Sequence, residues 1–431
     1  MVNRLASAAP DFDAAFRRLL EAKRGTAENV SAAVSKIIAD VRRRGDAAVV
    51  EYTEKFDRLK LKADALRVTA EEIDAAVEAA DRETVKALDL AAARIRAHHQ
   101  RQRPADDDYV DPLGVRLGSR WSAVPAVGLY VPGGTASYPS SVLMNAIPAQ
   151  VAGVERIVMV VPSPDGRLNA LVLVAARLAG VEEIYRIGGA QAVAALAYGT
   201  QTIRPVDKIV GPGNAYVAEA KRQVFGQVGI DMIAGPSEVL VVADAENDPD
   251  WIAADLLAQA EHDEDAQAIL VTDSATLADM VCEAVERQLS TLPRVATARE
   301  SWRRHGAVIV VDSLDEAAPM VDAIAPEHLE IATVDPEAFF AKIRNAGAVF
   351  LGRYTPEVIG DYVGGSNHVL PTSRSARFSS GLSVLDYMKR SSFLQCGPDQ
   401  LAALGPAAIR LAQAEGLQAH AQSVSIRTNR S

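Results

Sequence analysis

The fold of this chain is decided by the stretch Val127-Gly128-Leu129-Tyr130-Val131-Pro132-Gly133-Gly134-Thr135. Its first half is apolar enough for a buried strand, and its Pro-Gly-Gly run ends that strand in a turn. The pattern returns at Ile187-Gly188-Gly189-Ala190-Gln191 and at Val210-Gly211-Pro212-Gly213-Asn214. A fourth glycine turn, Ala234-Gly235-Pro236-Ser237-Glu238, stands just before its strand. These turns separate the units of an alternating strand and helix pattern.

The alternation predicts a mostly parallel sheet, because apolar strands joined by helices require crossover connections. The predicted strands are Val127–Val131, Ile157–Val161, Ile184–Ile187, Lys208–Val210 and Val239–Val242, with helices at Ser141–Ala152, Asn169–Ala179, Ala190–Ala197 and Ala215–Val224. The pattern resumes with strands at Ala268–Thr272, Val308–Val311 and Val349–Leu351 and helices at 275–291 and Pro336–Asn345. We therefore expect two α/β units.

The glycine turns favour a nucleotide site. Ligands of parallel sheets bind at the carboxyl ends of the strands, and glycine there lets the backbone approach a ligand closely. The simpler alternative, that these glycines only make turns, stays open. No G-x-G-x-x-G fingerprint occurs, because Gly211-x-Gly213 lacks the third glycine.

The predicted domains follow from where the patterns change. We expect an N-terminal arm, a discontinuous first α/β domain, a second α/β domain and a helical C-terminal segment, with bounds 1–24, 25–126 plus 239–382, 127–238 and 383–431. A long helix is expected to begin at Thr26, and short strands are expected between Ala105 and Ala123. The C-terminal helices are too few to form a core alone, so they must pack elsewhere, with another subunit as a candidate.

Composition excludes several classes of protein. The net charge of −11 argues against nucleic acid as a partner, and no run of apolar residues is long enough to span a membrane. The N-terminus lacks the apolar core of a signal peptide, and two cysteines form no motif. We expect a cytoplasmic protein in which histidine, carboxylate or amide groups hold any metal.

One helix end carries a pair that suits a metal. Asp248 is expected to cap a helix that opens with Pro249 and ends with Gln259 and His262 on one face. Such a pair alone is more often a solvated helix end. Polar clusters also surround His328, His368 and His420, whereas His98, His99 and His305 lie in Arg-rich stretches where a surface position is expected.

Taken together, these motifs resemble those of the histidinol dehydrogenase family. The resemblance rests on nine segments, at 127–134, 186–192, 208–214, 234–240, 258–262, 325–329, 358–362, 367–372 and 414–420. It runs in unbroken order from about residue 30, and the first 25 residues and the loop 292–305 lie outside it.

The resemblance implies a set of site residues. The zinc ligands would be Gln259, His262, Asp361 and His420, and the acid–base pair would be Glu327 and His328. Substrate contacts would come from Ser237 and Glu415 together with Gln259, His262, His328, Asp361 and His420. The NAD contacts would be Tyr130, Gln191 and Asn214. The role of His368 stays open.

The resemblance also implies an activity and an assembly. Proteins of this family oxidise L-histidinol through L-histidinal to L-histidine with two NAD, and form homodimers with shared active sites. The implied architecture is two incomplete Rossmann-like parallel-sheet domains with small terminal segments exchanged in the dimer. A related zinc- and NAD-dependent dehydrogenase of another alcohol, such as a sulfopropanediol, is the alternative. A zinc-bound scaffold without turnover is disfavoured, because both bases are present.

Overall fold

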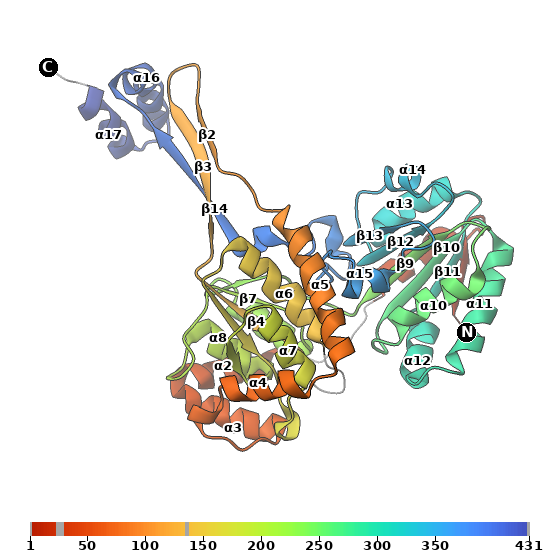
Figure 1. Cartoon of the computed structure of the whole chain (residues 1–431). Helices are drawn as coiled ribbons and strands as arrows, with labels where there is room; N and C mark the ends of the chain where they lie inside the picture. The colour runs from red at the N-terminus through yellow and green to blue at the C-terminus, as the bar shows by residue number, and fades with distance from the viewer. Residues whose placement is uncertain (1, 23–29, 134–137, 429–431) are drawn as a thin grey trace.

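The computed structural model of the chain describes residues 2–22, 30–133 and 138–428. It shows two α/β units side by side and an arm that projects from one of them (Figure 1). The predicted helix start at Thr26 and the residues Gly134 and Thr135 of the first glycine turn lie outside the described residues. No helix within the described ranges is both long enough and apolar enough to cross a membrane.

The first unit is built on a five-stranded parallel sheet with the order β6-β5-β4-β7-β8. Its strands are β4 (Ala126–Tyr130), β5 (Arg156–Val160), β6 (Glu183–Tyr185), β7 (Lys208–Val210) and β8 (Gly229–Ile230). The helices α6 (Pro139–Ala152) and α7 (Ala170–Leu178) cover one face, and α8 (Gly189–Tyr198) and α9 (Ala215–Val224) cover the other. This is the strand order of a doubly wound nucleotide-binding fold without its sixth strand.

The second unit is a six-stranded parallel sheet with the order β1-β11-β10-β9-β12-β13. Its strands are β1 (Asn3–Ala6), β9 (Glu238–Ala243), β10 (Gln267–Thr272), β11 (Ala307–Val310), β12 (His328–Ala332) and β13 (Ala348–Leu351). One face packs on α10 (Pro249–Ala260), α11 (Ala275–Leu289) and α12 (Val295–His305), and the other on α1 (Phe12–Glu21), α13 (Leu314–Ile324) and α14 (Pro336–Phe340). The five strands from β9 onward repeat the doubly wound order.

Two parts of the predicted domain division are wrong. The helices before Ala105 were expected to pack with 239–382, but they cover the five-stranded sheet instead. They are α2 (Ser31–Arg44), α3 (Asp46–Asp57), α4 (Ala70–Ala79) and α5 (Arg82–Gln100). The predicted arm 1–24 supplies an edge strand and a helix to the six-stranded sheet. An apolar face predicts that a helix is buried but not which sheet buries it.

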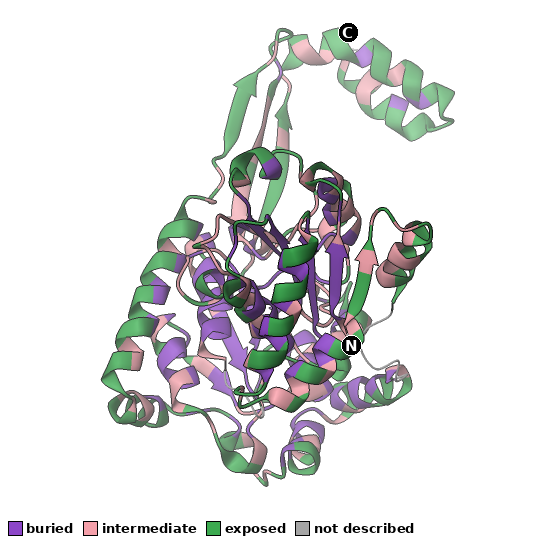
Figure 2. Ribbon diagram, turned by 90° about the vertical axis from the view of Figure 1, so that its right-hand side faces the viewer, coloured by how far each residue is buried: buried purple, intermediate pink, exposed green. Residues whose placement is uncertain are grey.

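The projecting arm combines strands and helices. The predicted strands between Ala105 and Ala123 are confirmed as β2 (Asp107–Val110) and β3 (Arg116–Ala123). The prediction of a wholly helical C-terminal segment is wrong, because β14 (Met388–Gln395) pairs antiparallel with β3 along its whole length. The described part of this segment is helical at η4 (Val384–Tyr387), a short 3-10 helix, and at α16 (Pro398–Ala414) and α17 (Gln418–Thr428). Figure 2 shows that this arm is mostly exposed.

The turn after β7 has a firm steric requirement for glycine. Gly211 has φ +107°, and a Cβ atom there would lie 2.1 Å from the carbonyl oxygen of Tyr130. The Gly211 N–H donates to Asp231 Oδ2 at 2.7 Å, and its carbonyl accepts from Lys221 Nζ at 2.9 Å. Lys221 and Asp231 form a buried ion pair. The turn is therefore held in one conformation by its neighbours.

We expect Gly211→Ala to cost roughly 3 kcal/mol or more of unfolding free energy, from the positive φ and the clash with Tyr130 together. Gly226→Ala is the matched control, since Gly226 has φ +100° and open space around it, and should cost about 1 kcal/mol. Urea unfolding of both variants measures the difference. Equal losses would show that the clash is relieved without cost.

Candidate active site

The predicted acid–base pair lies at the amino edge of the six-stranded sheet. His328 is the first residue of β12, and Glu238 is the first residue of the neighbouring β9. Ligands of such sheets usually bind at the opposite, carboxyl edge. Across from this amino edge, His368 Nε2 lies 3.3 Å from Ser141 Oγ, in the first turn of the helix that follows β4. The site therefore lies between the two units.

The ring of His328 has a defined tautomer. Its Nδ1 lies 2.9 Å from the backbone carbonyl oxygen of Glu238, which can only accept, so Nδ1 carries the hydrogen. Nε2 is buried, has no hydrogen-bond partner among the described residues, and lies 3.5 Å from Asp361 Oδ1. Burial alone would lower the pKa of His328, but Glu357, Glu327 and Asp361 together raise it well above its usual value. The raised pKa makes the ring bind a proton more tightly, and in the neutral ring this orientation leaves Nε2 as the atom that accepts it.

Glu327 is a carboxyl group tuned by burial. It is 6% exposed, and its Oε2 accepts the backbone N–H of Glu238 at 2.8 Å. Burial raises the pKa of Glu327 to about 7, against the opposing charge of His328. A carboxylate with a pKa near neutrality can take up and release protons at working pH, which suits a general base.

Two of the four predicted metal ligands, His262 and Asp361, lie close enough to affect the pKa of each other, and Gln259 precedes His262 at the end of α10. Gln259 is 2% exposed near the end of α10, and its Oε1 is buried with no hydrogen-bond partner in the described parts of the chain. Asp361 lies in α15 (Glu357–Tyr362). Burial alone would raise the pKa of Asp361, but His328, His368 and His262 outweigh it and lower that pKa. Asp361 therefore stays ionised.

His262 completes this group. Its side chain keeps an exposed surface, yet the protein around it lowers its pKa through partial burial, and the charge of Asp361 opposes that effect. An amide oxygen, an imidazole and a carboxylate are a donor set that suits zinc. Within the described residues, no group of three or more His, Cys, Asp or Glu side chains is arranged to hold a metal ion.

The fourth predicted ligand is far from this group. His420 lies on α17 and Glu415 directly follows α16, and both are exposed on the projecting arm. In Figure 1 this arm points away from α10 and α15. The structure does not bring His420 or Glu415 to the site of the same chain.

The predicted NAD contacts lie at the carboxyl edge of the five-stranded sheet. Tyr130, the last residue of β4, is buried, and its hydroxyl accepts the N–H of Gly189 at 2.9 Å. Gln191 is 1% exposed, and its Oε1 is without a hydrogen-bond partner among the described atoms. Asn214 caps α9 and is exposed. Ser237 is partly buried just before β9.

Sequence reasoning missed three acidic residues behind the site. Glu357 is 2% exposed, and its Oε2 lies 3.7 Å from His328 Nδ1. Glu330 is buried two residues after His328 on β12, and its Oε1 accepts the N–H of Glu357 at 2.6 Å. Asp255 on α10 is hydrogen-bonded to Glu330. Two spacings could have revealed Glu330 and Asp255, because Glu330 shares a strand face with His328, and Asp255 precedes Gln259 by one helical turn.

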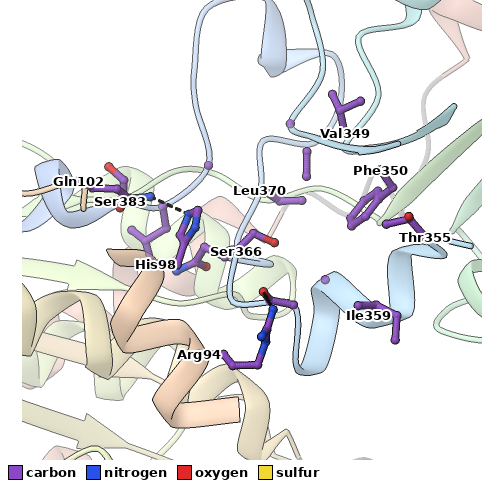
Figure 3. A pocket seen from close by; sticks show the side chains of 17 residues that line it. Arg94, His98, Gln102, Val349, Phe350, Thr355, Ile359, Ser366, Leu370 and Ser383 are labelled. Atoms are coloured by element: carbon purple, nitrogen blue, oxygen red, sulfur yellow. Dashed lines mark hydrogen bonds between the residues drawn. The ribbon is translucent and has the colours of Figure 1, made fainter. Parts of the chain in front are cut away.

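A separate cavity of about 540 Å³ lies on the other side of α15 (Figure 3). Arg94 and His98 of α5 line it, and none of the predicted site residues does. The ring of Phe350, which also lines it, lies 6.1 Å from the ring of His328. His99, which the sequence predicts at the surface, is instead fully buried. Its ring contacts the Ile95 carbonyl and the Asn367 side chain.

Comparison with known proteins gives a consistent result. The sequence profile of the histidinol dehydrogenase family matches residues 20–428. Histidinol dehydrogenases from Brucella suis and Rhodopseudomonas palustris are 68% and 69% identical to this chain, covering 100% and 99% of both sequences. A crystal structure of histidinol dehydrogenase from Elizabethkingia anophelis covers 99% of this chain and 98% of its own, with TM-score 0.94 and 37% identity. These matches include the loop 292–305 that the motifs had left out.

The pair Asp255 and Glu330 should make stability depend on pH. Burial raises the pKa of Asp255 to about 6, so its contribution is present at low pH and is lost as pH rises through about 6. Asp255→Asn resembles the protonated form. The unfolding free energy of Asp255→Asn, relative to that of wild type, should therefore rise between about pH 5 and pH 8. The rise should be on the order of 1 kcal/mol after allowance for the partial exposure of Asp255.

Urea unfolding at both pH values measures this gain. Asp273→Asn, at an exposed aspartate, is the control and should differ from wild type by the same amount at each pH. If the difference in unfolding free energy between Asp255→Asn and wild type also stays the same at each pH, the raised pKa of Asp255 is contradicted.

Proposed function

The chain belongs to the histidinol dehydrogenase family, and from this premise we propose that it oxidises L-histidinol through L-histidinal to L-histidine with two NAD. The observation that supports this most directly is the buried pair of His328 and Glu327. The Glu238 carbonyl accepts from His328 Nδ1, and the Glu238 N–H donates to Glu327 Oε2. His328 presents Nε2 as a proton acceptor, and Glu327 is a carboxyl group with a pKa near neutrality.

In the first step, His328 Nε2 accepts the hydroxyl proton of histidinol while hydride leaves the carbon that bears this hydroxyl group. The chemistry that NAD would supply when bound is acceptance of that hydride. The Glu238 carbonyl keeps the hydrogen on Nδ1, so the ring does not need to change tautomer to accept at Nε2. The product is an aldehyde and a protonated His328.

In the second step, Glu327 removes a proton from water as the water oxygen attacks the aldehyde carbon, and protonated His328 returns its proton to the aldehyde oxygen, which gives the hydrated aldehyde. His328 Nε2, now neutral, then accepts a hydroxyl proton from this hydrate as the second hydride leaves the carbon. The carbon reaches the level of a carboxylic acid. Each base is thus assigned to a proton transfer at a stated atom.

A zinc ion would be held by Gln259, His262 and Asp361 of one subunit and His420 of the partner subunit. The orphaned, buried Oε1 of Gln259 and the ionised Asp361 fit such an ion. When bound, it would orient the nitrogen atoms of the substrate. We propose a homodimer with the arms exchanged, which would bring Glu415 and His420 to the partner's site.

The surface of the arm supports this exchange. It exposes large apolar side chains that have no cover in one chain, namely Val110, Leu113, Leu394, Leu404, Leu411, Leu417 and Ile426. Exposed apolar groups of this number usually mark an interface. The negative net charge favours neither nucleic acid nor anionic membranes as partners, and a small-molecule enzyme of the cytoplasm fits this composition.

The remaining predicted contacts concern specificity. Glu415 would offer a carboxylate to the imidazole or ammonium end of histidinol, and Ser237 would contact the substrate at the amino edge of β9. Tyr130, Gln191 and Asn214 would contact NAD. Retention of Glu415 favours histidinol over the alternative, a sulfonated propanediol, whose sulfonate it would repel.

Initial rates of NADH formation with histidinol, histidinal and a sulfonated propanediol test the function. We expect His328→Asn to slow the oxidation of both histidinol and histidinal, by roughly 100-fold or more, because both steps use this base. Glu327→Gln should mainly slow the oxidation of supplied histidinal.

Wild type that oxidises the propanediol and leaves histidinol untouched would support the alternative substrate. Equal losses on both substrates in Glu327→Gln would contradict the division of roles between the two bases.

Subunit mixing tests the exchanged arms. Homodimers of His262→Asn and of His420→Asn should each be inactive. After subunit exchange, a hybrid would contain one site with both histidines intact, so mixing should restore up to about half of the activity per hybrid dimer. Exchange is verified with differently tagged subunits. Verified hybrids that stay inactive would show that the two histidines must come from one chain.

A further inference from the structure

Three carboxyl groups surround the imidazole of His328. Glu327 Oε2 and Glu357 Oε2 each lie 3.7 Å from Nδ1, and Asp361 Oδ1 lies 3.5 Å from Nε2. All three side chains lie at least partly buried. A charge that develops on this ring is therefore met by groups that water does not screen fully.

Two of these carboxyl groups have other tasks. Glu327 accepts the N–H of Glu238 and is the proposed base for water, and Asp361 is a proposed metal ligand. Glu357 has no such task, and its Oε2 is buried without a hydrogen-bond partner in the described ranges. A buried, unpartnered carboxyl oxygen is costly unless something compensates it. Burial raises the pKa of Glu357 to about 8, and the charge of His328 beside it opposes that rise.

The place of Glu357 is fixed from two directions. It is the first residue of α15, and its N–H donates to Glu330 Oε1 at 2.6 Å. Glu330 belongs to the same strand as His328 and points to the same face, so one strand holds both the ring and the support of its neighbour. Four residues on, the same helix presents Asp361 to the other side of the ring.

We infer that Glu357 is a positioning residue for His328, which lies against the Nδ1 edge of the ring and helps to hold the ring in the orientation that leaves Nε2 open. This inference rests on the proposed function, because it assigns the proton to His328. Glu357 touches neither substrate nor cofactor and acts through the histidine. The arrangement is that of a base oriented by a third group.

Glu357→Gln tests this role, since it keeps the size of the side chain and replaces the carboxyl group with an amide. We expect kcat with histidinol to fall roughly 10- to 100-fold, less than for loss of the base itself, because the Glu238 carbonyl still fixes the tautomer. KM for histidinol and for NAD, and the zinc content, should stay within about twofold. Glu357→Asp retains the carboxyl group and should recover part of kcat.

Glu337→Gln, at an exposed glutamate of α14, is the matched control and should leave kcat unchanged. A folded Glu357→Gln protein with wild-type kcat would overturn the inference, as would a loss confined to KM or zinc content. If Glu357→Gln does not fold, Glu357→Asp provides the test. Its shorter side chain increases the distance to His328, so kcat should fall while zinc is retained. Wild-type kcat in that variant would overturn the inference too.

Imidazole NMR of histidine-labelled protein gives a readout that does not depend on turnover. The Nδ1 signal of His328, assigned with His328→Asn, should shift in Glu357→Gln and stay in place in Glu337→Gln. If the signal shifts in Glu357→Gln but the wild-type protein does not oxidise histidinol, the proposed function fails while the contact between Glu357 and His328 stands. An unshifted signal would overturn the contact itself.

Discussion

The hydrogen bond from His328 Nδ1 to the backbone carbonyl of Glu238 is the interaction on which the site depends. It exists because β12 pairs with β9 in a register that places His328 opposite Val239, next to that carbonyl. The pairing of two parallel strands thus decides which nitrogen of the ring faces the substrate. A shift of one residue would turn the ring to the other face of the sheet. The chemistry is therefore built into the core of the second unit.

The two sheets share one strand order but use opposite edges. The five-stranded sheet turns its carboxyl edge, with the glycine turns, toward the amino edge of the six-stranded sheet. Each edge supplies what the other lacks: backbone that can approach a cofactor on one side, buried acids and imidazoles on the other. The fourth predicted metal ligand, His420, lies on the projecting arm, and the proposed exchange of arms would bring it to the site of the partner.

Much of this could be predicted from the sequence. Short apolar strands mark both sheets, glycine turns follow three strands of the five-stranded sheet, and the positions of His328 and Glu327 follow from a motif of adjacent residues. The register that joins β14 to β3 could not be predicted, because pairing across more than 260 residues leaves no local periodicity. The same limit hid Glu357, which is close to His328 only after β12, β13 and α15 have packed. Charge buried by tertiary structure has no signature in local sequence.

The number of NADH molecules formed from each histidinol tests the central claim most directly. A limiting amount of histidinol is oxidised to completion with excess NAD, and free aldehyde is trapped and measured alongside. The account predicts two NADH for each histidinol with no aldehyde released, because one buried site holds the bases for both steps. One NADH for each histidinol, with histidinal appearing in solution, would contradict it.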